Sequence, residues 1–274
     1  MRHNDQPPAG RLPVFLIAFC TVIVLLTTSS CGTPNLPGAH SAAPVPLTES
    51  HATTAVPVLL YNGTGTSAND VSAVEAVLSN LNLKYSTANT SQMEAMSESK
   101  LASYKLLLVP GGNSITIGNN LSHDATAKIH NAVVADGLHY LGICAGAFFG
   151  GYSVHNGINL TNGVWFNFYA DEFKGIHKEV VTLTFPQSSK MDMYWQDGPE
   201  LSGWGEIISK YADGTPSMVE GKSGNGWVML SGVHPEAPAS WRTGMPFKTS
   251  LAADLAYAGT LVTSAMNGTS LPHY

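Results

Sequence analysis

Apolar residues after residue 55 fall into two alternating patterns. Short continuous apolar runs predict buried strands, and segments in which apolar residues recur every three or four positions predict helices. In the first half of this region the expected strands are residues 56–61, 83–86 and 104–109, and the expected helices are residues 72–81, 93–101 and 124–135. A further strand leads into residue 144. Because strands alternate with helices, we expect a parallel sheet.

The second half of the region has a different pattern. Short apolar and aromatic runs are separated by turns rich in Gly, Asp and Asn, which is typical of antiparallel strands. The expected strands are residues 164–169, 180–185, 191–195, 207–211, 217–220 and 226–230, and a closing helix is expected at 250–266. Residues 56–274 are enough for one α/β domain with a sizeable core.

The N-terminus has the features of a targeting segment. Arg2 and Arg11 precede an apolar run at residues 14–26, which is short for a membrane span of about 20 residues and suits a signal-peptide core. Small residues and Cys31 follow, so the segment resembles a bacterial lipoprotein signal in which Cys31 becomes the lipidated first residue. Leu26 lies five residues before Cys31, whereas such signals usually have this leucine three before. An uncleaved anchor and ordinary secretion therefore stay open.

The segment that follows predicts a tether. Residues 31–55 are rich in Pro, Ala, Ser and Thr and have no apolar period, which is typical of a flexible linker. With residues 1–30 as signal peptide, we expect a protein of the cell envelope that is anchored to the membrane through lipid. Its domain would face the periplasm or the exterior.

Charge narrows the range of partners. The chain has 13 Lys and Arg against 19 Asp and Glu, a net charge of −6, and without residues 1–30 the counts are 11 and 18, a net charge of −7. No basic cluster occurs, which argues against nucleic acid as a partner. Only 12% of residues are charged, which suits an exported protein. The sequence identifies no protein partner.

Cysteine usage singles out one residue in the domain. Cys20 lies in the apolar signal core and Cys31 is the lipidation candidate, so Cys144 is the one cysteine left and cannot form an internal disulfide. Gly142 and Gly146 lie two positions either side of Cys144 at the end of an apolar run, as the tight turn of a nucleophile elbow requires. The alternative is a buried cysteine that only packs.

The same chain supplies partners for a thiol nucleophile. His234 and Glu236 follow the apolar run 226–230 and are two residues apart, so on an extended segment both side chains point to one side. His234 could then deprotonate Cys144 while Glu236 orients the ring, because a thiol needs a base and the base an orienting carboxylate.

An acyl-transfer site also needs donors for the developing oxyanion. Gly112 follows the strand 104–109, and its backbone N–H, together with the N–H of Ala145, would supply them. The alternative for Pro110, Gly111 and Gly112 is a plain turn.

Five segments together resemble class I glutamine amidotransferase-like domains and, within that group, the N-terminal domain of the larger biotin-protein ligases. They are LYNGTGTS at 60–67, LLLVPGGNS at 106–114, LGICAGAFFGG at 141–151, YWQDGP at 194–199 and HPE at 234–236. The resemblance spans about residues 56–236. It implies a flavodoxin-like α/β sheet with parallel core strands, helices on both faces and an added β-rich section. It also implies a Cys-His-Glu triad at Cys144, His234 and Glu236.

Two departures from the family limit what it implies. Amidotransferases that use glutamine usually carry Gln four residues after the nucleophile, where this chain has Phe148. The part of a biotin ligase that makes biotinyl-adenylate is also missing, so we expect no biotin ligation. The substrate is then a small molecule or short peptide, contacted by Phe148, Trp195, Gln196 and Asp197. A plain hairpin turn at 194–199 is the alternative.

Nothing in the sequence requires a cofactor or a metal. His123, His130 and His139 lack the spacing of a zinc-binding helix, and the GTG at 63–65 is not followed by the Lys-Ser/Thr of a phosphate-binding loop. Two functions remain. One is a cysteine-dependent hydrolase of an amide or ester carbonyl, and the other is a binding or regulatory module that retains the elbow but catalyses little.

The first prediction concerns Cys31. The mature protein should carry lipid on Cys31 and sediment with membranes, because two or more acyl chains anchor a protein stably where one does not. Substituting Cys31→Ser should remove the lipid mass and release the protein from the membrane fraction. Intact-mass analysis and fractionation check this. An unchanged mass and unchanged membrane association would exclude lipidation at this residue.

Overall fold

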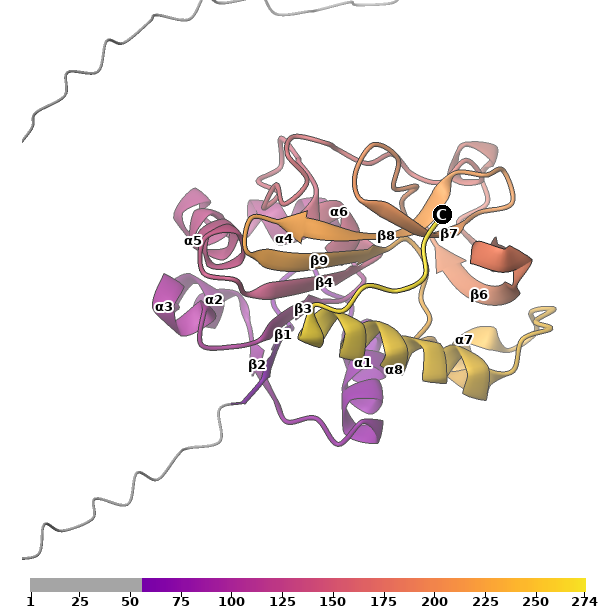
Figure 1. Ribbon diagram of the computed structural model, residues 1–274, viewed down its shortest axis with the longest axis horizontal. Coiled ribbons are helices and arrows are strands. Elements are labelled where there is room, and N and C mark those ends of the chain that lie inside the picture. The colour runs from indigo at the N-terminus through magenta and orange to yellow at the C-terminus, as the bar shows by residue number, and fades with distance from the viewer. Residues whose placement is uncertain (1–55) are drawn as a thin grey trace, which may run out of the picture. The chain divides into compact units, whose positions relative to one another are not determined.

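The computed structural model describes residues 56–274, so the expected signal peptide, the tether and Cys31 lie outside the described residues. The described strands form one nine-stranded sheet in the order β2-β1-β3-β4-β9-β8-β7-β5-β6 (Figure 1). The first five of these are parallel neighbours, and the pairs from β9 onward are antiparallel. The predicted α/β class, with a parallel core and a β-rich section, is confirmed.

The strand bounds follow the apolar runs closely. The parallel strands are β1 (Val58–Tyr61), β2 (Tyr85–Ala88), β3 (Leu106–Val109), β4 (His139–Ile143) and β9 (Gly226–Ser231). The antiparallel strands are β5 (Lys178–Thr184), β6 (Lys190–Gln196), β7 (Glu206–Lys210) and β8 (Pro216–Ser223). The antiparallel section continues the same sheet.

The helices connect the parallel strands and close the domain. They are α1 (Ala68–Asn80), α2 (Thr90–Ala95), α3 (Glu98–Leu101), α4 (Ser114–Asn119), α5 (His123–Val134), α6 (Ala145–Gly150), α7 (Ala239–Arg242) and α8 (Leu251–Asn267). Two short 3-10 turns, Glu172–Lys174 and Pro186–Ser188, lie in the second half. Within residues 56–274, no helix is long and apolar enough to cross a membrane.

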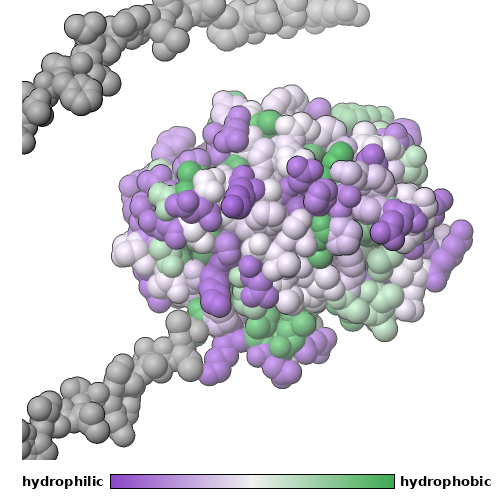
Figure 2. Space-filling model, viewed as in Figure 1, coloured by the Kyte–Doolittle hydropathy of each residue, from purple (hydrophilic) through white to green (hydrophobic). Residues whose placement is uncertain are grey.

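Alternate residues of each strand pack against opposite layers of helices. In β3, Leu106 and Leu108 belong to the core under α1 and α8, whereas Leu107 and Val109 belong to the core under α4, α5 and α6. Figure 1 shows these two layers on the two sides of the sheet. The face in Figure 2 is mostly polar or neutral with apolar residues in small groups, one of them at the lower edge near α1. The period of two in the strands therefore builds a three-layer domain.

Capping residues explain two differences from the predicted helices. Ser67 caps α1, so this helix begins at Ala68, four residues before the predicted start. The predicted helix at 93–101 is two helices, because the side chain of Ser97 accepts the backbone N–H of Lys100 and begins α3 after α2 has ended. The prediction of a single helix at residues 93–101 was wrong.

The strand predicted at residues 164–169 was also wrong. These residues form no ladder, and their sole sheet-like contact is an isolated bridge between Phe168 and Pro199. Trp165 and Phe168 remain exposed. The segment belongs to a long connection from α6 to β5 that its own hydrogen bonds hold, for example from the N–H of Tyr152 to the carbonyl of Val164 at 2.8 Å.

The turn after β4 leaves no room for a side chain at Gly146. A Cβ there would lie 1.9 Å from the carbonyl oxygen of Val109 and 2.8 Å from its carbon, and both are backbone atoms that cannot rotate away. We therefore predict that Gly146→Ala lowers the free energy of unfolding by about 2 kcal/mol or more. Urea denaturation of the purified protein measures it.

Gly221→Ala is the matched control. Its Cβ would meet Trp204 at 3.4 Å, an ordinary contact, so the change should stay within about 0.5 kcal/mol. Equal stability of the Gly146 and Gly221 variants would contradict the prediction.

Candidate active site

Cys144 occupies the strained turn between β4 and α6. Its backbone has φ 50° and ψ −105°, a conformation that a non-glycine residue adopts at a cost of roughly 1–3 kcal/mol. A Cβ at Gly142 would lie 2.4 Å from the carbonyl oxygen of Gly146, so both flanking glycines are required by space. Cys144 therefore lies on a tight turn between a strand and a helix. Cys144 is the sole cysteine of the described residues, is unpaired, and is 5% exposed.

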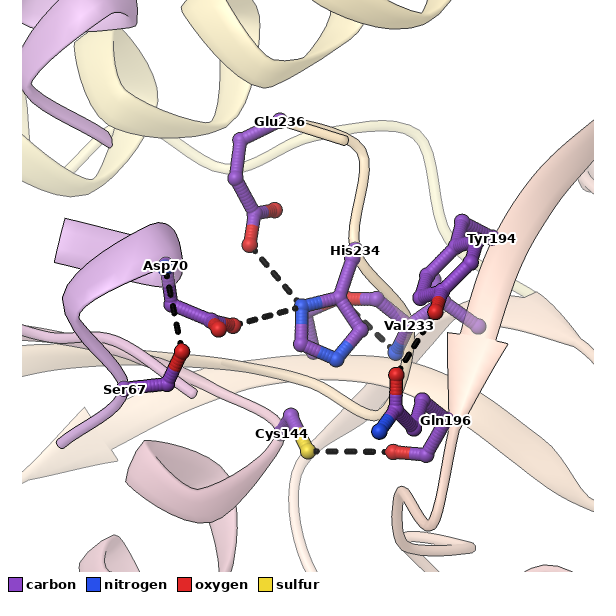
Figure 3. Close-up of polar contacts among 9 residues, drawn as sticks. Ser67, Asp70, Cys144, Tyr194, Gln196, Val233, His234 and Glu236 are labelled. Atoms are coloured by element: carbon purple, nitrogen blue, oxygen red, sulfur yellow. Dashed lines mark hydrogen bonds and ion pairs between the residues drawn. The ribbon is translucent and has the colours of Figure 1, made fainter. Parts of the chain in front are cut away.

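His234 and Glu236 follow β9 and face the elbow. The Nδ1 atom of His234 lies 2.9 Å from Oε1 of Glu236, and both side chains are buried. The other ring nitrogen points toward Cys144 (Figure 3). The backbone N–H of His234 donates to the carbonyl of Tyr194 at 2.8 Å, and the rings of Tyr194 and Trp241 pack at 5.8 and 5.7 Å from the imidazole. The structure therefore brings the three predicted triad residues together and fixes the ring.

Asp70 is a second carboxylate on the same imidazole. Its Oδ1 atom lies 3.2 Å from Nδ1 of His234, and Figure 3 shows Asp70 and Glu236 directed at the same ring nitrogen. Asp70 is in the first turn of α1, where an acidic residue often bonds back to the N–H of the capping residue. Here the N–H of Ser67 donates to the carbonyl of Gly111 at 3.0 Å, which leaves the Asp70 carboxylate available for His234.

Gly111 makes this contact possible. A Cβ at this position would lie 2.1 Å from Oδ1 of Asp70 and 2.8 Å from Cε1 of His234. Because Gly111 has no side chain, the Asp70 carboxylate and the His234 imidazole can approach each other here. Sequence reasoning missed Asp70 because it lies before the predicted start of its helix.

The three groups shift one another's protonation. Burial disfavours the imidazolium, but the Cys144 sulfur and the carboxylates of Glu236 and Asp70 outweigh it and raise the pKa of His234 well above its usual value. Burial also disfavours the Asp70 carboxylate, yet its hydrogen bond to His234 lowers the pKa of Asp70 overall. Burial raises the pKa of Glu236. The group that ionises more readily beside the charged ring is therefore Asp70.

Cys144 lies where two cavities meet. The larger, of about 620 Å³, is lined by Asp70, Tyr194, His234 and Trp241 among others, and the smaller, of about 220 Å³, is lined by Gly112, Ala145 and Phe148 among others. Cys144 lines both. The thiol donates a hydrogen bond to the carbonyl of Gln196 at 3.4 Å (Figure 3). A substrate carbonyl could thus reach the sulfur from either side.

The two predicted oxyanion donors line the smaller cavity. Ala145 is the first residue of α6, so its N–H has no partner within the helix, and Gly112 has φ 146° with its backbone close to Gly65. Among the hydrogen bonds of the described residues, none is donated by the N–H of Gly112 or of Ala145. Both donors are therefore available beside Cys144.

The expected substrate contacts divide into two groups. Phe148 lines the smaller cavity, Gln196 the larger, and Asp197 both. Trp195, in contrast, is fully buried, and its Nε1 donates to the carbonyl of Gly198 at 3.2 Å. Successive residues of β6 point to opposite faces, so Tyr194 and Gln196 face the site and Trp195 packs behind it. The prediction that Trp195 contacts substrate was wrong.

Two groups of possible metal ligands come together that the sequence spacing did not indicate. Asp70, His234 and Glu236 form one, and Glu172, His177 and Asp197 the other, with all ligand atoms of a group within 4.8 Å of one another. In the second group, Nδ1 of His177 lies 3.1 Å from Glu172 and 3.0 Å from Asp197. These bonds raise the pKa of His177, whereas burial and the nearby Asp197 raise the pKa of Glu172.

Part of the chain is similar to a known family. Residues 56–164 match the family model described as "Biotin-protein ligase, N terminal". This similarity covers less than half of the chain. It includes Asp70, Gly112, Cys144 and Phe148 but ends before His234. A comparison with curated protein sequences found no match.

Solved structures support the fold over a longer stretch. A crystal structure of a glutamine amidotransferase is 20% identical and superposes with a TM-score of 0.51, covering 65% of this chain and 90% of that one. A glutamine amidotransferase from Methylobacillus flagellatus is 13% identical with a TM-score of 0.51, covering 80% of this chain and 97% of that one. At these identities the likeness shows the fold. The domain therefore has the fold of these glutamine amidotransferases, and its first half is similar to the N-terminal domain of biotin-protein ligases.

The site geometry predicts a reactive thiol whose pH dependence involves Asp70. The carboxylates of Glu236 and Asp70 raise the pKa of His234, so the ring can accept the thiol proton and stabilise the negative sulfur that forms, and iodoacetamide should alkylate Cys144 faster than a free thiol at pH 6. His234→Ala should abolish the difference. Asp70→Asn removes one charge that supports the imidazolium, so the pKa of His234 should fall and alkylation at neutral pH should slow.

Rates measured from pH 4 to 9 test both statements, with Asp124→Asn as control because Asp124 pairs with Lys128 at the surface. A pH profile for Asp70→Asn that superposes on that of the unmodified protein would show that Asp70 does not act on the ring. Alkylation only in denaturant would identify Cys144 as a packing residue.

Proposed function

We propose that this protein is a cysteine-dependent hydrolase that acts on an amide or ester carbonyl. The observation that carries the proposal is the convergence of the strained Cys144 with a buried imidazole held by two carboxylates. A strained backbone and buried ionisable groups both lower the stability of a fold. They are typical of a nucleophile and its base. The oxyanion donors beside the sulfur support the same chemistry.

The proposed reaction has two steps. His234 takes the proton from the thiol, and the Cys144 sulfur bonds to the carbonyl carbon while the N–H groups of Gly112 and Ala145 bind the oxyanion. The carbon–nitrogen or carbon–oxygen bond then breaks as His234 gives the proton to the leaving atom, which leaves a thioester. Water attacks the thioester, His234 takes its proton, and that proton returns to the sulfur as the acid leaves.

Asp70 and Glu236 act in this scheme as positioning residues. Oε1 of Glu236 accepts from Nδ1 of His234, which keeps the other ring nitrogen toward Cys144, and Oδ1 of Asp70, 3.2 Å from Nδ1, helps to stabilise the imidazolium that forms in each step. The scheme needs no metal or cofactor.

Glutamine is not the substrate we propose. Phe148 stands four residues after the nucleophile, and its ring packs at 5.0 Å from that of Phe168 at the wall of the smaller cavity. An apolar ring beside the sulfur offers no hydrogen bond to a glutamine side chain and favours a larger, less polar acyl group. Biotin ligation is likewise not part of the proposal.

A second candidate is a binding or regulatory module of the same fold. The observation that favours it is the environment of Cys144, whose side chain is 5% exposed and donates a hydrogen bond to the carbonyl of Gln196. A substrate must displace this bond before His234 can act. In either case we propose a membrane-anchored envelope protein whose ligand is a small molecule or short peptide, with no nucleic acid partner.

We predict that the purified protein hydrolyses members of a panel of small amides, esters and short peptides, and that it releases no ammonia from glutamine above background. Cys144→Ala should abolish hydrolysis, and His234→Ala should reduce it by about 10²–10⁴-fold. Rates should not depend on a chelator. Robust glutaminase activity would overturn the substrate argument, and a wholly inert panel would favour the binding module.

A further inference from the structure

We propose that the substrate carries an apolar acyl group that binds in a third cavity, next to Phe148. This inference rests on the proposed hydrolase function and adds the substrate class. The acyl cavity, as we call it, has a volume of about 470 Å³. Its apolar walls are Ile115, Phe148, Tyr152, Val154, Trp165 and Phe168. A volume of this size holds a medium alkyl chain or an aromatic ring.

The acyl cavity exposes apolar surface that the fold does not need to expose. Val154 is 81% exposed and Trp165 is 62% exposed, although the domain has two closed cores elsewhere. The connection that carries them is held in place, since the N–H of Leu160 donates to the carbonyl of Gly150 at 2.8 Å and the side chain of Asn156 donates to the carbonyl of Leu121 at 2.8 Å. Exposed apolar side chains on a fixed segment are typical of a ligand surface.

The acyl cavity adjoins the smaller cavity that Cys144 lines. The residues that line both are Ser114, Ile115, Phe148 and Phe168. In our proposal, a chain attached to a carbonyl carbon at the sulfur enters the acyl cavity along the rings of Phe148 and Phe168. The occupant is thus a part of the substrate itself.

The position of His234 decides which part of the substrate this is. His234 lines the larger, polar cavity and not the smaller one, so the leaving nitrogen or oxygen that receives its proton must lie on the polar side. The oxyanion donors Gly112 and Ala145 hold the carbonyl oxygen in the smaller cavity. The remaining substituent, the acyl chain, then points toward Phe148. An apolar acyl group on a polar amine or alcohol fits this arrangement.

The two carboxylates of the smaller cavity lie beside an imidazole. Nδ1 of His177 forms a hydrogen bond with Oδ1 of Asp197 at 3.0 Å and lies 3.1 Å from Oε1 of Glu172. The apolar lining that the smaller cavity shares with the acyl cavity comes from Ile115, Phe148 and Phe168.

The test is the dependence of hydrolysis on chain length. For 4-nitrophenyl esters from acetate to octanoate, kcat/KM should rise roughly two- to fourfold per methylene, since burial of one methylene contributes about 0.8 kcal/mol and the leaving group is constant. Trp165→Ala should lower the octanoate-to-acetate ratio at least fivefold. Tyr274→Ala is the matched control, because this ring is 47% exposed and packs under Lys210 at the C-terminus, away from the acyl cavity.

A second arm measures binding without turnover. Octanoate titrated into Cys144→Ala should bind saturably by calorimetry, and Trp165→Ala in that background should weaken binding at least fivefold. Cys144-dependent hydrolysis that is flat or falling with chain length overturns the inference and leaves the proposed function intact. Absence of both hydrolysis and alkylation overturns the proposed function. In that case saturable octanoate binding that depends on Trp165 still supports an apolar ligand, and its absence overturns the inference.

Discussion

Nδ1 of His234 lies within 3.2 Å of two buried carboxylates, those of Glu236 and Asp70, and the elements of the parallel half of the sheet bring the three groups together. Glu236 arrives beyond β9 and Asp70 in the first turn of α1, and they meet because parallel strands end at a common edge. Two buried carboxylates this close repel each other, and the imidazolium between them offsets the repulsion. The protonation of His234 and the packing of α1 against the segment after β9 therefore depend on each other.

Sequence reasoning located the parts of the site whose signals are local. Gly142, Cys144 and Gly146 form one short motif, and His234 and Glu236 are two residues apart, so chain geometry alone brings each set together. Asp70 carries no such signal, because it approaches His234 through a tertiary contact 164 residues away along the chain. Its helix also begins earlier than apolar spacing indicates, since a serine cap, and not an apolar residue, determines the start.

The errors in the sequence prediction have a common cause. Trp195 and the segment 164–169 are rich in aromatic side chains. Aromatic residues occur both in strand interiors and in ligand cavities, so their presence alone does not distinguish the two. Whether such a residue packs in the core depends on which strand lies beside it, and that is a property of the whole sheet. The alternation of β6 turns Trp195 into the core, whereas Trp165 has no neighbouring strand and stays at the surface. By contrast, every residue of β1 and β3 is apolar, so the sequence alone indicates that both strands are buried on both faces.

Phe148 lies beside Cys144 and lines the cavity in which the proposed substrate would bind. A residue four positions after the nucleophile lies one helical turn along α6 on the same face, so any side chain there must border the space beside the sulfur. A polar side chain at this position would close a small hydrogen-bonding pocket, whereas a phenyl ring, stacked edge-on against Phe168, gives the sulfur an apolar neighbour that is open toward Trp165. Under the proposed function, Cys144, His234 and Glu236 can thus stay fixed while a single position of α6 decides whether the acyl side of the site is polar or apolar.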